Sequence, residues 1–272
     1  MNTSNYLFLL RQIADNKTAH KIYKQIQELR MIVPLGADFL TPFLSDEQID
    51  HLAQMCLEFR EENLPDFIAI SDRIYPDRLR EIYNAPVILY YSGNLELLTT
   101  NTITVVGGRN FDAYGHKITD QLIPYLVDQN YTIVSGLARG IDSYAQELTL
   151  KNQGSTIAVI GSGIDVYYPY ENRELQKTIS SKHLTLSEYP TGMRPRQHHF
   201  VDRNRILAGL SEQTIVVQSK KKSGTLITAE IALSENRSIF TFPGEIFNEN
   251  FEGNNQLIFQ GATPILSFDT VN

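Results

Sequence analysis

The chain has 272 residues, a formal net charge of −7 and a single cysteine, Cys56. This length can bury a large core as one big domain or two unequal ones, and one cysteine excludes an intrachain disulfide and suits a reducing cytosol, so a cytoplasmic protein is expected. The apolar run at 6–10 is interrupted by Arg11 and is too short for a signal peptide or a membrane span.

The first residues predict a small all-helical module, over 1–62, ahead of a larger domain over 63–272. Apolar residues recur at helical spacing between 18 and 29, and Ser45-Asp-Glu-Gln48 is a capping box that begins another helix. Six Lys/Arg against seven Asp/Glu up to residue 60 leave the module nearly neutral. This balance favours a structural or protein-contact role over direct contact with DNA.

The segment after the module predicts two strands that extend the main sheet. These are 67–70 and 87–91, and a turn-rich stretch over 76–86 separates them.

The rest of the chain repeats one unit between Ile103 and Glu230: an apolar strand-like run, a loop of small residues, and a helical pattern. Buried parallel strands are short continuous apolar runs, and alternation with helices indicates a parallel sheet covered on both faces. The fold class predicted is therefore α/β, an extended Rossmann-like domain with a mostly parallel sheet behind a small all-helical domain. The four apolar runs are 103–106, 131–134, 156–160 and 214–217.

The loops after these runs combine glycine with a nearby cation. Ligands bind outside the carboxyl ends of parallel strands, where glycine lets backbone N–H groups approach an anion and a helix N-terminus adds partial positive charge. Residues 191–230 hold seven Lys/Arg against three Asp/Glu, a local +4 that leaves −11 for the remainder. A basic stretch on an acidic protein indicates a confined anion site, here one for phosphates.

The loops and the segments after them contain a series of distinctive stretches: Val106-Gly-Gly-Arg109, Val134-Ser-Gly-Leu-Ala-Arg-Gly-Ile-Asp142, Thr156-Ile-Ala-Val-Ile-Gly-Ser-Gly-Ile-Asp165, Ser187-Glu-Tyr-Pro190, Arg203-Asn-Arg-Ile-Leu-Ala-Gly-Leu210, Ser223-Gly-Thr-Leu-Ile-Thr-Ala229 and Gly261-Ala262. These stretches resemble the DNA-processing protein A family (DprA, also called Smf), and the resemblance covers about 72–265, in order. Four residues depart from the family pattern: the family usually has serine at Gly108, histidine at Gln146, glutamate at Gln218, and cysteine or a similar residue at Asn254. Several members carry a SAM-like domain at the position of the helical module, so the resemblance implies a SAM-like fold for it.

The resemblance implies a recombination mediator of bacterial transformation that binds incoming single-stranded DNA, protects it and helps load the RecA recombinase. It implies a homodimer, for which Ile258 and Phe259 are the candidate contacts, and no enzyme activity, cofactor, metal or membrane. Many members continue into a winged-helix domain, and a short form without it is expected. The candidate DNA-binding residues are Gly107, Gly108, Arg109, Ser135, Gly136, Arg139, Gly140, Gly161, Gly163, Phe200, Arg203, Asn204, Arg205, Lys222, Ser223, Gly224 and Thr225.

Competing interpretations stay open for several of these residues. The lysine run at 220–222 is compatible with a solvated turn, and Arg203 and Arg205 with a structural network. Phe200 is predicted to stack on bases while cations contact the backbone of the nucleic acid. For the tyrosines at 167–170, stacking on bases and packing at the edge of the sheet both stay open.

Three other functions are disfavoured by the motifs. Gly161-Ser-Gly163 lacks the third glycine and the immediate helix of a dinucleotide fingerprint, and His198-His199 lacks partners at ligand spacing. The enzymatic alternative is a nucleotide-processing hydrolase of the lonely-guy, lysine-decarboxylase-like type. Gly224-Thr225 lacks the double glycine of that signature, and Glu230 is too far along the chain.

Overall fold

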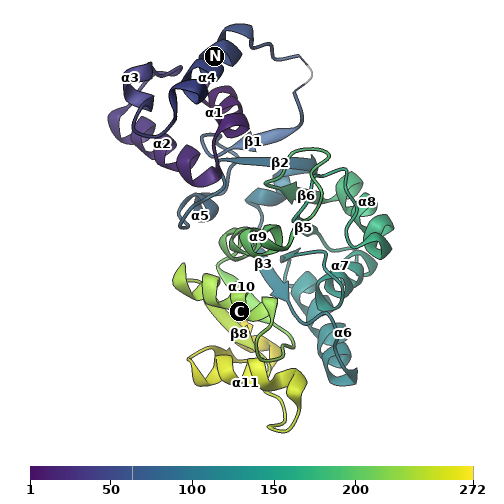
Figure 1. Ribbon diagram of the computed structural model, residues 1–272. Coiled ribbons are helices and arrows are strands. Elements are labelled where there is room, and N and C mark those ends of the chain that lie inside the picture. The colour runs from purple at the N-terminus through teal and green to yellow at the C-terminus, as the bar shows by residue number, and fades with distance from the viewer. Residues whose placement is uncertain (63, 272) are drawn as a thin grey trace.

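A computed structural model gives the fold and describes residues 1–62 and 64–271. Nine strands form one sheet in the order β1-β2-β6-β5-β4-β3-β7-β8-β9, and every pairing from β6 to β9 is parallel, whereas β1 and β2 are antiparallel additions (Figure 1). The mostly parallel α/β fold predicted from the sequence is confirmed. The strands are β1 (Phe67–Ala69), β2 (Ile88–Gly93), β3 (Thr102–Val106), β4 (Thr132–Ser135), β5 (Thr156–Ile160), β6 (Leu184–Ser187), β7 (Gln213–Val216), β8 (Ser238–Thr241) and β9 (Thr263–Pro264).

The helices of the main domain cover the two faces of the sheet. The chain changes once the direction in which it adds strands across the sheet. From β3 the chain steps to β4, β5 and β6, and then crosses back to β7 on the other side of β3. The first four helices are α6 (Ala113–Asp128), α7 (Ile141–Lys151), α8 (Arg173–Lys182) and α9 (Gln197–Leu210). The remaining ones are α10 (Gly224–Ser234) and α11 (Glu252–Phe259), with short elements α5 (Asp77–Arg80), η1 (Leu95–Thr99), η2 (Tyr170–Asn172), η3 (Glu249–Phe251) and η4 (Phe268–Val271).

Alternation of apolar side chains along the central strands gives the sheet a separate core on each face. Ile103 and Ile133 pack in one cluster with Leu122 of α6, whereas Val106 and Val134 pack in another, with residues of α9 and α10. Period-two alternation produces this division, because successive side chains of a strand point to opposite faces. The direction in which strands are added reverses between β3 and β7. Open parallel sheets have their ligand-binding crevice at such a point.

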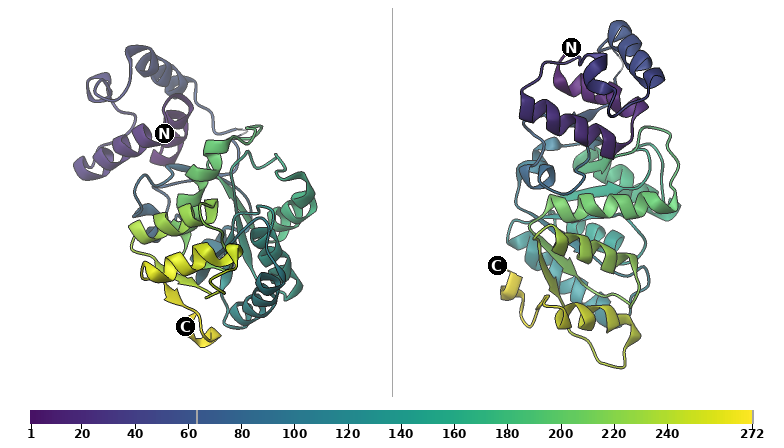
Figure 2. Two further views of the ribbon diagram at one scale, coloured as in Figure 1. Left: turned by 60° about the horizontal axis from the view of Figure 1, so that its bottom comes forward. Right: turned by 60° about the vertical axis from the view of Figure 1, so that its left-hand side comes forward.

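The N-terminal helices lie at the β1 end of the sheet, far from α11 in all views (Figures 1 and 2). They are α1 (Thr3–Ile13), α2 (Asn16–Leu29), α3 (Ala37–Leu40) and α4 (Asp46–Glu58), and the capping box predicted at Ser45 and Gln48 begins α4. Tyr6 and Leu10 share one apolar cluster with Ile68, so the helical module is continuous with the core at this edge. The predicted domain boundary lies between residues 62 and 63, and residue 63 lies outside the described residues.

A search of the described residues for membrane spans finds no helix with the length and apolar character that crossing a bilayer requires.

Candidate nucleic-acid interface

The loops after β3, β4 and β7 meet at the carboxyl edge of the sheet. We call them the β3 loop (107–109), the β4 loop (136–140) and the β7 loop (217–223). The amide of Gly108 donates to the carbonyl of Gln218 at 2.7 Å, and the amide of Ile141 donates to the carbonyl of Gly108 at 3.2 Å. The β3 loop is therefore bonded on both sides, and it lies at the point where the direction of the chain reverses.

Glycine is required where these loops touch. Gly140 has a φ of +90°, and a Cβ there would lie 2.2 Å from the carbonyl oxygen of Gly108 and 2.6 Å from the Cα of Arg109. A Cβ on Gly107 would lie 2.5 Å from the side chain of Ile141. These close approaches, rather than a general need for flexibility, explain the glycines of the two loops.

Three of the cations at this edge are available to a ligand. Arg109, Lys221 and Lys222 are exposed, and no ion pair of theirs is found among the described residues. Arg139 is exposed too, but it forms a bidentate pair with Glu171, which raises the pKa of Arg139 by hydrogen bonding and charge. The edge thus presents free positive charge on the β3 and β7 loops and partly neutralised charge on the β4 loop.

The side chains of Arg203 and Arg205 belong to the protein interior, which corrects their proposed phosphate contacts. Arg203 is only 5% exposed, and its Nη1 donates to the carbonyls of Gly136 and Val159 at 2.7 and 2.6 Å. Arg205 pairs with buried Glu188 at 2.7 Å. The alternative of a structural network, which the sequence left open for these two arginines, is the one found. The acid that pairs with Arg205 is Glu188 and not the nearby Asp202.

Two further predicted donors are occupied within the fold. The hydroxyl of buried Ser135 donates to the carbonyl of Val105 at 2.7 Å, and the buried amide of Asn204 donates to the carbonyl of Gly224 at 3.4 Å. Neither side chain is free to hydrogen bond to a phosphate, because burial and an existing partner both oppose it.

The carboxylate of Asp142 lies inside the protein, next to backbone amides of the β3 and β4 loops. This carboxylate accepts from the amide of Gly107 at 3.3 Å, and hydrogen bonding by the amides of Gly136 and Ala138 lowers its pKa as well. Burial raises the pKa of Asp142 to about 6, and the charge of Arg203 and these hydrogen bonds oppose that rise. The amides of Gly107 and Gly136, predicted as phosphate donors, therefore already have an anion.

An aromatic wall stands beside the loop after β5. Phe200 packs over Gly161, and its ring centroid lies 5.4 Å from that of Tyr168. Tyr170 is 70% exposed, with the guanidinium of Arg173 5.8 Å from its ring centroid. Gly161 is buried and the amide of Gly163 donates to the carbonyl of Met193, so this loop offers rings in place of free amides.

The start of α10 is open to solvent next to the lysine run. The hydroxyl of Ser223 caps the helix by accepting from the amide of Leu226, and a Cβ on Gly224 would meet nothing within 4 Å. Thr225 is buried. A shallow pocket of about 450 Å³ here is lined by Lys221, Lys222, Ser223, Gly224, Leu226, Ile227, Glu230 and Gln256.

Of the four residues that depart from the family pattern, Gly108 lies in the β3 loop and Gln218 in the β7 loop, whereas Gln146 and Asn254 are buried in the fold. Gln146 is fully buried and donates to Thr156 and to the carbonyl of Ile157, so it is remote from any ligand. Gln218 is also buried, and its Oε1 accepts from the amide of Asp112 at 3.0 Å. Buried Asn254 accepts from the amide of Ser219 at 2.7 Å, which fixes the β7 loop.

Of the two adjacent histidines, His198 is exposed and His199 packs against the loop after β5. Nδ1 of His199 lies 3.1 Å from the carbonyl oxygen of Gly161, and its ring stacks on Tyr189 with centroids 3.8 Å apart. Within the part of the chain that the structure describes, no three His, Cys, Asp or Glu side chains are grouped as metal ligands would be.

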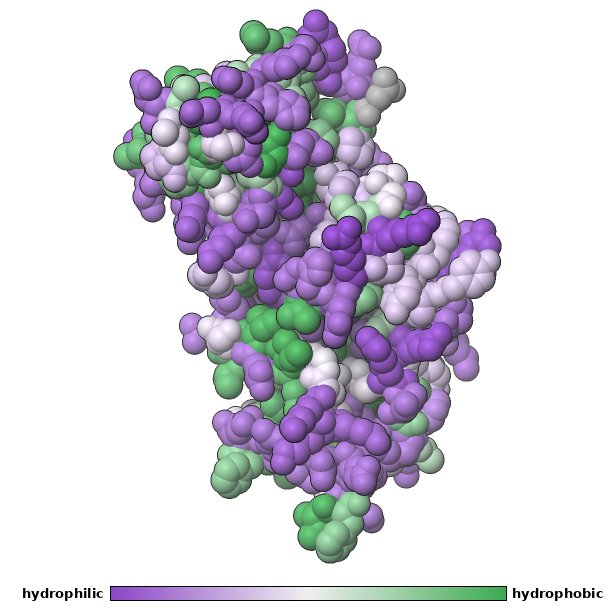
Figure 3. All heavy atoms as spheres, viewed as in Figure 1, coloured by the Kyte–Doolittle hydropathy of each residue, from purple (hydrophilic) through white to green (hydrophobic). Residues whose placement is uncertain are grey.

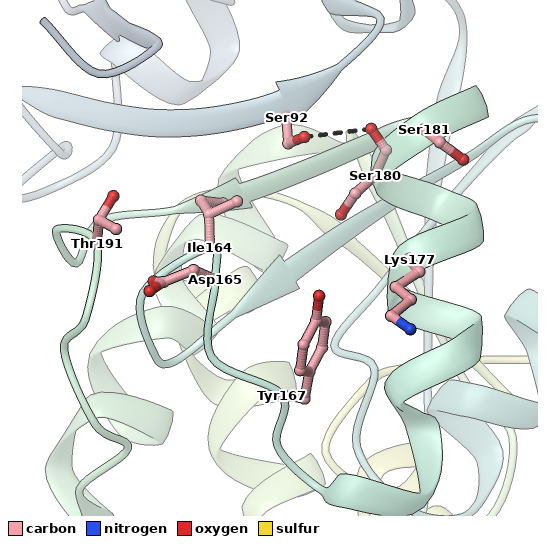
Figure 4. A pocket seen from close by; sticks show the side chains of 8 residues that line it. All are labelled: Ser92, Ile164, Asp165, Tyr167, Lys177, Ser180, Ser181 and Thr191. Carbon is pink, nitrogen blue, oxygen red and sulfur yellow. Dashed lines mark hydrogen bonds between the residues drawn. The ribbon is translucent and has the colours of Figure 1, made fainter. Parts of the chain in front are cut away.

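A second pocket, of about 520 Å³, lies between α8 and the loop after β5 (Figure 4). Tyr167 stands at its centre, with Lys177 of α8 on one side and Asp165 on the other, and Ser92 donates to the carbonyl of Ser180 at its rim. The carboxylate offsets the one cation, so this pocket lacks the net positive charge that the β3 and β7 loops present. Its polar lining had no signal in the sequence, because the lining residues come from separate segments.

A family model described as DNA recombination-mediator protein A matches residues 66–272. The chain belongs to this family. DNA processing protein DprA of Streptococcus pneumoniae is 46% identical over 220 residues, 81% of this chain and 76% of that protein. The Bacillus subtilis protein of the same name is 40% identical over 81% of this chain and 74% of its own length. Membership of a family of recombination mediators agrees with the prediction that the protein is not an enzyme, and it disfavours the hydrolase alternative.

Solved structures of the family share the fold. The S. pneumoniae DprA structure superposes with a TM-score of 0.89 at 37% identity and covers 100% of this chain and 98% of that one. DNA processing protein A from Helicobacter pylori, whose structure is described as giving a single-stranded DNA binding mode, has a TM-score of 0.69 at 28% identity and covers 76% of this chain and 94% of that one. The predicted resemblance and the Rossmann-like architecture are both confirmed.

Proposed function

We propose that this recombination-mediator protein binds single-stranded DNA without sequence preference along the carboxyl edge of its sheet. The observation that carries the proposal is the group of free cations, Arg109, Lys221 and Lys222, on loops that flank the reversal of the sheet. Cations that follow a backbone beside exposed rings are the arrangement by which proteins hold single strands. The H. pylori relative named for such binding supports it.

The interface that we propose differs from the one first expected. Arg109, Arg139, Lys221 and Lys222 would contact phosphates, Phe200 with Tyr168 and Tyr170 would stack on bases, and the start of α10 would supply the exposed amide of Gly224. Ser135, Arg203, Asn204 and Arg205 are left out, because their side chains are buried in the fold.

Binding of a labelled oligo-dT, measured by fluorescence anisotropy against an equal length of duplex, tests the substrate. We expect the single strand to bind at least about tenfold more tightly, and its log affinity to fall with log salt by about 0.7 for each phosphate contacted. Equal or tighter binding to the duplex would refute the proposal. Release of free base from nucleoside monophosphates would instead support the hydrolase.

We also propose that the protein acts as a homodimer that helps load RecA onto the strand during transformation. Figure 3 shows apolar residues over α10 and at the end of the molecule that carries α11. On α11, Phe259 is 92% exposed and Ile258 is half-buried beside it, whereas on α10 Leu233 is 59% exposed. We propose the dimer contact at Ile258 and Phe259, because an almost fully exposed phenylalanine next to a second apolar residue is an apolar surface that association would bury.

Two matched charge insertions separate these surfaces. Phe259→Asp should yield monomers by light scattering with the fold retained, whereas Leu233→Asp should leave the dimer intact. A dimer that survives Phe259→Asp, or dissociates only with Leu233→Asp, would place the contact elsewhere. Loading is tested by whether the protein speeds RecA assembly on a single strand already coated with single-strand binding protein, and an unchanged rate would refute that part.

A further inference from the structure

The N-terminus of α7 places an acidic side chain under the candidate interface. Asp142 is the second residue of α7 and only 5% exposed, and the N-cap residue of this helix, Gly140, provides no side-chain hydrogen bond. The amide of Gly107 in the β3 loop donates to its carboxylate at 3.3 Å, and a Cβ on Gly136 of the β4 loop would lie 2.5 Å from its Oδ2. Hydrogen bonding by the amides of Gly136 and Ala138 lowers the pKa of this carboxylate. One anion therefore joins two loops that are well separated in the sequence, at Gly107 and Gly136.

The contact between these loops transmits the position of one to the other. The carbonyl of Gly108 accepts from the amide of Ile141, next to Asp142, and the space around Gly140 is closed by Arg109. Because there is no room for even a methyl group between Gly140 and the β3 loop, a displacement of the β4 loop moves the backbone of Arg109. The position of the β3 loop therefore depends on its contact with the β4 loop as well as on its hydrogen bond to the β7 loop.

The charge of Asp142 is balanced from the opposite face of the sheet. Arg203 of α9 and Asp142 lie on two sides of Gly136, where a Cβ would be 2.1 Å from Nη1 of the arginine and 2.5 Å from Oδ2 of the aspartate. The other charged or titratable groups that act on this arginine are Arg109 and Tyr189. A carboxylate with two acceptor oxygens suits three converging N–H groups, whereas an asparagine would have one oxygen and would turn an NH₂ group toward donors.

We propose that Asp142 is a positioning residue of the single-strand interface: its carboxylate holds the β3 and β4 loops together in the arrangement that presents Arg109. It does so from inside the protein and does not touch DNA. The inference rests on the proposed function for its DNA readout, while the geometry that it invokes belongs to the free protein.

A double-mutant cycle tests the proposal on oligo-dT. Asp142→Asn should lower affinity by about fivefold or more, on the order of the coupling between contacting groups, whereas the control Asp120→Asn, which removes the same charge from the exposed face of α6, should not. In an Arg109→Ala background Asp142→Asn should cost no further affinity, because its effect passes through that arginine. Unchanged affinity for folded Asp142→Asn, or losses that add in the cycle, would overturn the proposal.

The wild-type protein supplies a second measurement if the variant does not fold. Amide resonances of Gly107, Gly136 and Ala138 should titrate together in NMR spectra, with one midpoint near the pKa of about 6. Separate midpoints, or no titration of these amides, would overturn the role of Asp142. Wild-type protein that fails to bind single strands would refute the proposed function, whereas equal binding by wild type and Asp142→Asn would refute only this inference.

Discussion

Replacing Gly136 with alanine should destabilise the protein strongly, because the added methyl group enters the space between two buried charges. The Cβ would lie 2.1 Å from Nη1 of Arg203 and 2.5 Å from Oδ2 of Asp142. Relieving the clash displaces Nη1 from the carbonyls of Gly136 and Val159, which it reaches at 2.7 and 2.6 Å. Overpacking costs about 1–3 kcal/mol, and disturbing the hydrogen bonds of a buried charge adds to it, so we expect a loss of about 3 kcal/mol in the free energy of unfolding.

Urea denaturation and thermal melting measure this loss. For a chain of this size, about 3 kcal/mol corresponds to a fall in Tm on the order of 6–12 °C. Gly224→Ala is the matched control: it adds the same methyl group where nothing lies within 4 Å, so its effect should stay within about 1 kcal/mol. A Gly136→Ala variant as stable as this control would refute the account of the space around the β4 loop.

Three further predictions follow from the ion pairs and caps. Glu188→Ala should lower the free energy of unfolding by about 3–5 kcal/mol in urea denaturation, because Arg205 stays buried without its partner, whereas Glu188→Gln should cost less; equal stability of wild type and Glu188→Ala would contradict this. Burial opposes ionisation of Asp112, but hydrogen bonds from its neighbours outweigh it and hold its pKa below the usual value. Its stabilisation is therefore fully present above pH about 4 and is lost as the pH falls below that value, through the lowered pKa of the folded state. The stability deficit of Asp112→Ala should accordingly be largest at pH 7 and shrink in acid, and a constant deficit would count against it. Glu171→Ala frees the Arg139 side chain and should raise affinity for oligo-dT, by anisotropy at low salt; an unchanged or weaker affinity would mean that Arg139 makes no phosphate contact.

The parallel strands of the repeating units and the location of the loops after them could be predicted, because the pattern of the sequence has a direct physical cause, whereas the order of the strands in the sheet has no such local signal. Parallel strands covered on both faces must be apolar throughout, so runs such as 103–106 and 156–160 stand out from the helices between them. Loops that follow such strands must share one edge of the sheet, whatever their side chains do.

The roles of individual cations could not be predicted in the same way, because a charged residue has the same letter whether it is buried or exposed. Arg203 was assigned to phosphates, yet it lies on the inner face of α9. Its spacing to Ile206, Leu207 and Leu210 is the i, i+3, i+4, i+7 spacing of one helix face, and this was the available signal. The acid that pairs with Arg205 lies 17 residues away at the end of β6, so only the fold brings the two together.

Affinity of arginine variants for oligo-dT tests the central claim, that the carboxyl edge of the sheet is the single-strand interface. Arg109→Ala removes an unpaired cation and should weaken binding by about tenfold or more, since a charge-assisted contact is worth roughly 1.5–3 kcal/mol, and should lower the salt slope by about 0.7. Arg73→Ala, an exposed arginine after β1 at the far end of the sheet, should change neither quantity. Unaltered affinity and slope for folded Arg109→Ala, or an equal loss in Arg73→Ala, would contradict the account.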